Sequence, residues 1–413
     1  MRQDEGPAAH TSRSDLMSRL LQVSHGSAAP TRHVASLDAL RGLAALAVVF
    51  FHLSLIAQQS LDSHQQGLQT ALQTARLTPL FVFFAGSESV LVFFILSGFV
   101  LYLMLNSRAM PYTVYVRRRL LRLYPPYLVA VLISVVLVGL LGGHHAPGFG
   151  SWVNSVWQRP PDFITLLHHI LVIGNPDTEP YNFVLWSLVQ EMQISLIFPL
   201  LYAAVLRFKP AGVLAGCLGL SVLANVLALI LAHTSPGLAY LLTPYLDSLH
   251  YLIFFAAGAL MARRSATLGR WYGALSVWRK LLLIAGGLAC YTYGHLLMVH
   301  FGIASRIGDL LILPGAFMLV LLFSHSQRVI QLSQHPAPQF LGRISYSLYL
   351  YHGVTLLAVV FGLGRHLALV PLLLLALILI LPVCTLAYSA VEQPAIQWSR
   401  RGARRSVVPP ASD

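Results

Sequence analysis

Charged side chains are scarce in this sequence. Only 10% of its 413 residues are Asp, Glu, Lys or Arg, whereas 56% are hydrophobic, and the mean hydropathy is +0.70. Soluble domains carry about 25% charged residues, so this composition excludes a soluble globular protein of this length. It predicts an all-α, polytopic membrane protein, because helices satisfy their own backbone hydrogen bonds in lipid.

Cysteine is also scarce. The three cysteines, Cys217, Cys290 and Cys384, lie in separate apolar segments and lack the spacing of metal ligands. This pattern excludes a cysteine metal site and favours three inert core residues. We therefore expect no metal and no cofactor.

Acidic residues are outnumbered by basic ones, 14 against 27, which gives a net charge of +13. Such a balance is compatible with nucleic-acid binding. Here, however, most Arg and Lys residues fall in every second segment between apolar runs. That arrangement follows the positive-inside rule, so we expect membrane lipids and no nucleic acid as partners.

Runs of about twenty apolar residues predict ten transmembrane helices. The distribution of Arg and Lys places both the N- and the C-terminus in the cytoplasm. We expect a disordered cytoplasmic tail over residues 1–34, a ten-helix membrane domain over 35–398 and a basic cytoplasmic tail over 399–413. The predicted helices are centred near residues 47, 93, 131, 195, 222, 252, 289, 316, 351 and 380.

One further apolar segment, from Phe163 to Gly174, is too short to cross a bilayer. Pro160 and Pro161 precede it, and Pro176 follows it. We interpret it as a re-entrant or interfacial helix.

The first long apolar stretch contains Arg41 and His52. A cation in hydrocarbon is costly and needs a reason. Eleven helical steps bring the two side chains to within roughly 20° of one face, about 16 Å apart along the axis. The spacing predicts that they line one wall of one cavity. Asp38, three residues before Arg41, is placed to serve as its counter-ion.

A second cluster of basic residues, Arg117 to Arg122, begins the third predicted helix. One interpretation is an anchor that binds lipid headgroups. The other is a phosphate-binding clamp, because Arg119 and Arg122 share a face at i, i+3 spacing and guanidinium groups match phosphate geometry. Arg118 lies beside them.

Five other polar positions lie in or near predicted helices. Glu191 either complements a helix dipole or faces the cavity. Ser97, beside Gly98, is typical of close helix packing. Tyr346 and His352 belong to a run of hydroxyls and one imidazole along the ninth helix, where interhelical hydrogen bonds explain most members and His352 is a candidate for the site. Glu392 is interpreted as a helix-end anchor.

Taken in order along the chain, these segments resemble membrane-bound acyltransferase family 3, whose members are O-acyltransferases of cell-surface glycans and some secondary metabolites. Any single motif is weak, but six in sequence are specific, and they cover about residues 36–398. The matching segments are residues 37–52, 93–99, 117–127, 186–191, 345–352 and 392–394.

The resemblance implies ten spans and acyl transfer from cytoplasmic acyl-CoA, as donor substrate, to a hydroxyl group. His52 matches the family's essential histidine, and Arg41 matches its partner. Arg119 and Arg122 match the cytoplasmic arginine motif associated with the donor, and Glu191 falls where the family usually keeps an acid. We expect a multi-pass protein of the bacterial plasma (inner) membrane with a glycan or glycolipid acceptor.

Our hypothesis is that His52 removes the proton of the acceptor hydroxyl while Arg41 orients the donor or stabilises negative charge. An acyl-enzyme intermediate is an open alternative. A transporter is the competing class, because buried charges also suit a substrate pathway. A non-enzymatic scaffold does not explain Arg41 and His52.

Overall fold

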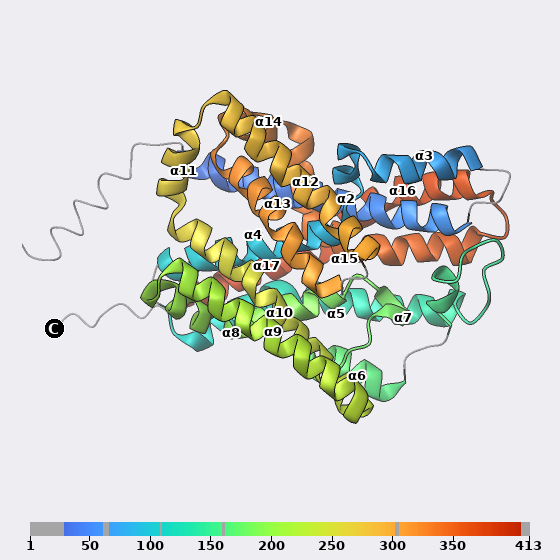
Figure 1. Cartoon of the computed structure of the whole chain (residues 1–413). Coiled ribbons are helices and arrows are strands. Elements are labelled where there is room, and N and C mark those ends of the chain that lie inside the picture. The colour runs from blue at the N-terminus through green and yellow to red at the C-terminus, as the bar shows by residue number, and fades with distance from the viewer. Residues whose placement is uncertain (1–28, 61–65, 108–109, 159–161, 302–304, 406–413) are drawn as a thin grey trace, which may run out of the picture.

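The computed structural model describes residues 29–405, apart from 61–65, 108–109, 159–161 and 302–304 (Figure 1). Within these residues the chain is all helical, which confirms the predicted fold class. Most of the expected N-terminal tail, residues 1–28, and the last part of the expected C-terminal tail, residues 406–413, lie outside the described residues.

Nine described helices are long and apolar enough to cross a membrane, and α11 with α12, bent by 119°, supplies a tenth if the pair counts as one span. This agrees with the ten predicted centres and makes the chain a multi-pass membrane protein. The long helices are α2 (Ala29–Ser60), α4 (Gly86–Ser107), α5 (Tyr112–Leu141), α8 (Trp186–Arg207), α9 (Pro210–Thr234), α10 (Pro236–Arg263), α12 (Val277–Phe301), α13 (Ser305–His325), α15 (Pro336–Leu363) and α16 (Leu369–Ala387).

Shorter elements connect or extend these spans. They are α3 (Gln66–Arg76), α6 (Phe163–Leu171), α7 (Glu179–Asn182), α11 (Ser265–Ala274), α14 (Gln327–Ser333) and α17 (Gln393–Arg405), with 3-10 turns at Pro79–Phe83 and Val153–Ser155. A π-helical turn, Tyr388–Glu392, joins α16 to α17. Residues 369–400 therefore form one continuous candidate span.

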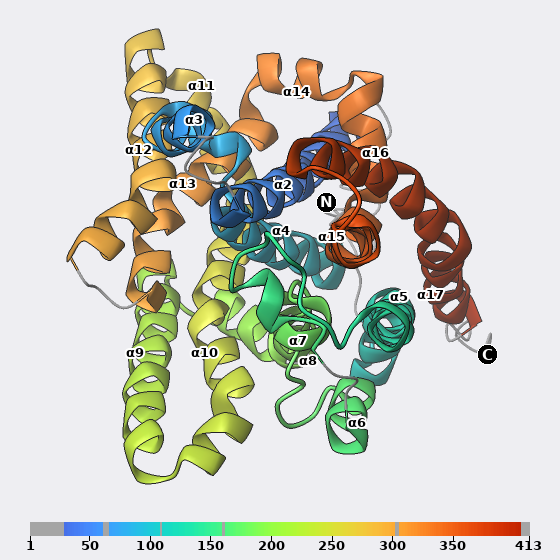
Figure 2. The same cartoon turned by 90° about the vertical axis from the view of Figure 1, so that its right-hand side faces the viewer.

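The centre of the bundle is formed by α2, α4, α10 and α15. Helix α2 packs along α15 and α4, and α10 packs along α4 and α9. Viewed along the bundle, α2, α4 and α15 lie inside, whereas α9, α12 and α17 lie at the periphery (Figure 2). Accordingly, α15 is largely buried and α9 is largely exposed to the surroundings of the protein.

Two close helix contacts depend on glycine. A Cβ atom on Gly42 of α2 would collide with the backbone of Leu341 and Gly342 in α15. Likewise, a Cβ atom on Gly98 of α4 would collide with the backbone of Phe255 in α10. Small residues let helix backbones approach in membranes. The Gly42 contact fixes α2 against α15, the two helices that carry His52 and His352, and the Gly98 contact fixes α4 against α10.

Helix α6 forms the core of the short apolar segment. The Asp162 carboxylate caps it by accepting a hydrogen bond from the Thr165 N–H at 2.9 Å. These bonds lower the pKa of Asp162. Phe163 and Ile164 are exposed, whereas His169 faces inward. The helix is short and amphipathic, as expected for an interfacial segment.

Candidate active site

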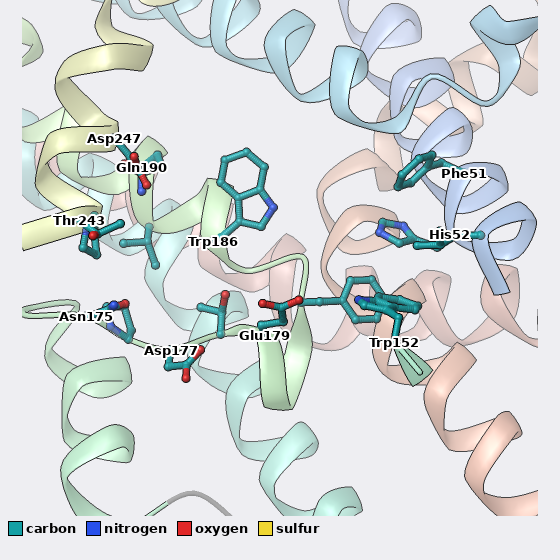
Figure 3. Close-up of a pocket in the computed structure, with 16 residues that line it drawn as sticks. Phe51, His52, Trp152, Asn175, Asp177, Glu179, Trp186, Gln190, Thr243 and Asp247 are labelled. Carbon is teal, nitrogen blue, oxygen red and sulfur yellow. The ribbon is translucent and has the colours of Figure 1, made fainter. Parts of the chain in front are cut away.

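A cavity of about 430 Å³ opens where the end of α2 meets α8 and α10. His52 forms part of one wall (Figure 3). The opposite side is formed by residues 175–179, which precede and begin α7, and by Thr243 and Asp247 of α10. A volume of this size suits a small molecule or one portion of a larger one.

His52 is hydrogen-bonded on one side only. Its Nδ1 atom lies 2.9 Å from the Val48 carbonyl oxygen and 3.2 Å from Nε2 of His352. The Nδ1 atom of His352 lies 3.0 Å from the Leu348 carbonyl oxygen. Since carbonyl oxygens only accept hydrogen bonds, both Nδ1 atoms carry the proton in the neutral rings. His352 Nε2 is then an acceptor, and His52 Nε2 keeps its lone pair.

His52 Nε2 has no hydrogen-bond partner among the described residues, and its ring lines the cavity. Aromatic rings hold the imidazole in place. The ring of Trp152 stacks on it with centroids 6.1 Å apart, and Phe183 lies 4.5 Å from it. The Nε2 atom of His52 is therefore available to a ligand in the cavity.

Arg41 lies toward the other end of α2. Its Nη1 atom forms an ion pair with Asp38 at 3.3 Å, and its side chain is 17% exposed. Arg41 is also close enough to Arg122 of α5 for direct charge repulsion. Both guanidinium groups therefore contribute positive charge to the same region between α2 and α5.

Arg119 and Arg122 have different surroundings. Arg119 is buried and directs Nη2 to the Glu191 carboxylate at 3.1 Å and to the Ser195 hydroxyl at 2.9 Å. Arg122 is exposed, although charges from α2, α5, α8 and the π-helical turn surround it. The structure therefore gives Arg119 a protein partner and leaves Arg122 accessible to a ligand.

Glu191 belongs to a polar cluster between α4, α5 and α8. Besides the ion pair with Arg119, its Oε1 atom accepts a hydrogen bond from Ser97 at 2.9 Å. Glu191 does not line the cavity beside His52. Its catalytic role stays a prediction, and the contacts favour a role in holding Arg119.

Tyrosines of α15 bind the backbone of α5 around the pair Pro125 and Pro126. The Tyr346 hydroxyl donates to the Leu123 carbonyl at 2.8 Å, and the Tyr351 hydroxyl donates to the Pro126 carbonyl at 3.1 Å. Prolines remove backbone donors from a helix and loosen it locally. Tyr346 therefore fixes the turn that carries Arg122. A second contact holds the same helix: the Ser399 hydroxyl of α17 donates a hydrogen bond to the Arg118 carbonyl oxygen of α5 at 2.9 Å.

The interpretation of Glu392 as a helix-end anchor is wrong. The residue lies within the continuous span 369–400, where it is 6% exposed. Its Oε2 atom accepts hydrogen bonds from the Ser347 hydroxyl at 2.6 Å and the Ser347 N–H at 3.1 Å. Its charge also acts on Arg122. The Pro394 that follows suggested a helix end, but proline is tolerated in the first turn of the α-helix that resumes after the π-turn.

The predicted residues thus form two groups. His52 lines the cavity and contacts the buried His352 behind it, whereas Arg41 and Arg122 contribute charge to one region toward the other end of α2. The second group includes Arg119 and Glu191 as a buried pair. No cluster of three or more His, Cys, Asp or Glu residues in the described part of the chain is arranged to hold a metal ion. Cys217 and Cys384 are buried free thiols.

The Arg119 and Glu191 pair should behave as a structural unit. Replacing one partner, as in Arg119→Met or Glu191→Leu, leaves a buried charge and should cost roughly 3 kcal/mol of stability. The double variant should recover much of that loss. Thermal unfolding in detergent measures the stability of the two single variants and of the double variant. Additive losses would contradict the assignment, and lost activity with unchanged stability in Glu191→Gln would favour a catalytic carboxylate.

Comparisons with known proteins point to one family. A family model described as an acyltransferase domain matches residues 34–389. The acyltransferase MdmB of Streptomyces mycarofaciens is 37% identical over 175 residues, which cover 41% of this chain and 39% of that protein. The O-acetyltransferase PaAT-1 of Phomopsis amygdali is 25% identical over 390 residues, which cover 80% of this chain and 73% of that protein. No solved structure matches the chain significantly.

Proposed function

Since this chain belongs to acyltransferase family 3, we propose that it transfers an acyl group, acetyl by default, from cytoplasmic acyl-CoA to a hydroxyl group. The acceptor in this proposal is a cell-surface polysaccharide or another glycosylated molecule, and the location is the bacterial plasma membrane. Family membership and the distribution of Arg and Lys along the chain support the proposal.

The observation that carries this proposal is the orientation of His52. Its free Nε2 atom can remove the proton of an acceptor hydroxyl while the oxygen attacks the thioester carbonyl. A C–O bond then forms and the C–S bond breaks. The proton held on His52 passes to the sulfur of the departing CoA. The imidazole is regenerated, and no metal or further reactant is needed.

The donor would approach from the end of α2 that carries Arg41. Arg122 and Arg41 are placed to bind the CoA phosphates, because guanidinium groups bind phosphate through two parallel hydrogen bonds. The pantetheine arm would then extend along α2 toward His52. Arg119, Arg118, Glu191, Ser97 and Tyr346 support the inner site in this scheme.

Labelled acetyl-CoA tests the proposal directly. Membranes that contain the protein should move label from acetyl-CoA into a glycan extract, and the label should be released by mild alkali as expected for an ester. Membranes without the protein provide the control. Uptake of a solute that does not depend on acetyl-CoA, with no label transferred, would instead support a transporter.

His352 acts as a positioning residue in this mechanism. In His352→Phe, the His52 Nδ1–H loses its side-chain acceptor, so kcat should fall roughly tenfold to a hundredfold, part of the 10²–10⁴ that a positioned base contributes. The KM for acetyl-CoA should not change. His352→Gln should recover most of the rate, because its amide oxygen can accept the same hydrogen bond.

The matched pair of variants separates positioning from packing. If His352→Phe and His352→Gln lose activity equally and unfold at the same lowered temperature, His352 is a structural residue only. The pH dependence of kcat adds a second readout. Loss of the partner of His52 should shift the pH at which the base becomes protonated and kcat falls, whereas a packing defect should lower kcat by the same factor at every pH.

A further inference from the structure

Acidic side chains dominate the charge of the cavity that His52 lines. Asp177, Glu179 and Asp247 line it, and no Lys or Arg is among the described residues that do so. Asp177 and Asp247 lie across the cavity from His52, and Glu179 lies between (Figure 3). A wall of one charge sign concentrates ligands of the opposite sign.

One of these carboxylates already has a counter-ion. Arg306 of α13 forms an ion pair with Asp247 from behind the wall. His250 and Asp309 also lie in this region, with His250 Nε2 and the Asp309 carboxylate 3.6 Å apart. Asp247 is therefore part of a protein ion-pair network, and the charge at the cavity depends mainly on Asp177 and Glu179.

Asp177 is half-buried and has no ion-pair partner among the described residues. Burial raises the pKa of its carboxyl group, and a backbone hydrogen bond from Glu179 opposes this shift. The neighbouring imidazole of His169 does not supply a charge: its Nε2 atom contacts the Asp177 carbonyl oxygen at 3.1 Å, and burial lowers the pKa of His169 to about 4. His169 is therefore neutral at physiological pH.

Two tryptophans complete the cavity. Trp152 and Trp186 line it together with Asp177 and Glu179, and Trp186 is 36% exposed. The faces of indole rings attract cations and pack against the apolar faces of sugar rings. The lining thus combines a carboxylate without a counter-ion at one side with the His52 base and the Trp152 ring at the other, and Trp186 lies between them (Figure 3).

We propose that the acceptor is an alcohol that also carries a positive charge, such as an amine-bearing sugar, with its ammonium group at Asp177 and Glu179 and its reacting hydroxyl at His52. This inference rests on the proposed function of the cavity. An ammonium group would supply the counter-ion that Asp177 lacks, whereas a carboxylate on the acceptor would be repelled. The pocket therefore selects against acidic sugars.

Three methyl glycosides that differ only in charge test the inference. Methyl glucosaminide is cationic, methyl glucoside is neutral and methyl glucuronide is anionic at neutral pH. Their binding to the full-length protein in detergent can be followed by calorimetry at low ionic strength. The cationic glycoside should bind at least about tenfold more tightly than the neutral one, a difference typical of one partly buried charge pair, and the anionic one should bind most weakly.

Substitutions test whether the Asp177 carboxylate causes the preference for the cationic glycoside. Asp177→Asn should bring the affinity for the cationic glycoside close to that for the neutral one. Asp162→Asn provides the control, because it removes the same charge from a fully exposed helix cap that asparagine also caps well. Equal affinities for the three glycosides, tighter binding of the anionic one, or no binding of any would each overturn the inference.

The two proposals can fail separately. His52→Ala protein should keep the preference for the cationic glycoside, because binding does not need the base. A charge preference without any acyl transfer would contradict the proposed reaction alone. Acyl transfer to neutral, anionic and cationic glycosides at equal rates would contradict the charge selection alone.

Discussion

Replacing His52 by alanine should lower the rate of acyl transfer by about 10²–10⁴-fold, the contribution that a positioned general base usually makes. The variant removes the only imidazole nitrogen that faces the cavity without a hydrogen-bond partner among the described residues. Binding of acyl-CoA should persist, since Arg41 of α2 and Arg122 of α5 are unchanged. Transfer of labelled acetyl groups and equilibrium binding of CoA, measured on the same protein preparation, check both parts.

A matched control comes from a histidine outside the site. His233 is exposed in the last turn of α9, so His233→Ala should transfer acetyl groups at the normal rate. Full activity in His52→Ala would show that another group removes the proton. Loss of CoA binding together with activity would mean that the substitution disturbs the bundle, and the unfolding midpoint of the variant would reveal this.

Replacing Arg122 by glutamine should raise the KM for acetyl-CoA by about tenfold to a hundredfold with little change in kcat. One charge-assisted contact to a phosphate contributes roughly 1.5–3 kcal/mol, and 1.4 kcal/mol corresponds to a factor of ten. Steady-state rates at varied acetyl-CoA concentration measure the effect. Raising the salt concentration should reduce the difference between the wild type and the variant, because salt screens exposed charges.

Two comparisons make this test specific. Arg117 is exposed on the same helix, but its side chain lines a separate apolar groove together with Tyr112 and Leu120. Arg117→Gln should therefore leave the KM for acetyl-CoA unchanged. S-acetylpantetheine has no nucleotide phosphates, so the wild type and Arg122→Gln should use it equally. An equal defect with both donors would assign Arg122 to structure or membrane topology instead of phosphate binding.

The sequence predicted the fold well because lipid leaves few choices. Twenty apolar residues in a row have one stable form in a bilayer, a helix, and the Arg and Lys between such runs indicate which side each loop faces. The spacing of Arg41 and His52 predicted that both line one wall of one cavity, but only His52 lines the cavity at the end of α2, and Arg41 lies toward the other end of the helix. The sides of the membrane on which the loops lie stay a prediction.

Contacts between distant segments were beyond the reach of that periodicity. His352 was only a candidate for the site, because nothing local shows that it lies 300 positions from its partner His52 in the sequence and 3.2 Å from it in space. Arg119 and Arg122 were predicted to act together, yet a three-residue step leaves about 60° between their directions on a helix. That angle is enough to give the two side chains different surroundings: Arg119 pairs with Glu191, whereas Arg122 stays exposed.

Helix α2 fixes the distance between Arg41 and His52, because both side chains belong to one continuous helix. The close contact of Gly42 with Leu341 and Gly342 prevents α2 from sliding along α15. In the proposed reaction, the length of α2 between Arg41 and His52 would set how far the thioester carbonyl reaches from the nucleotide end of the donor, whatever its acyl chain. Selection among acyl chains would then depend on the side chains around His52, which include Trp152 and Phe183.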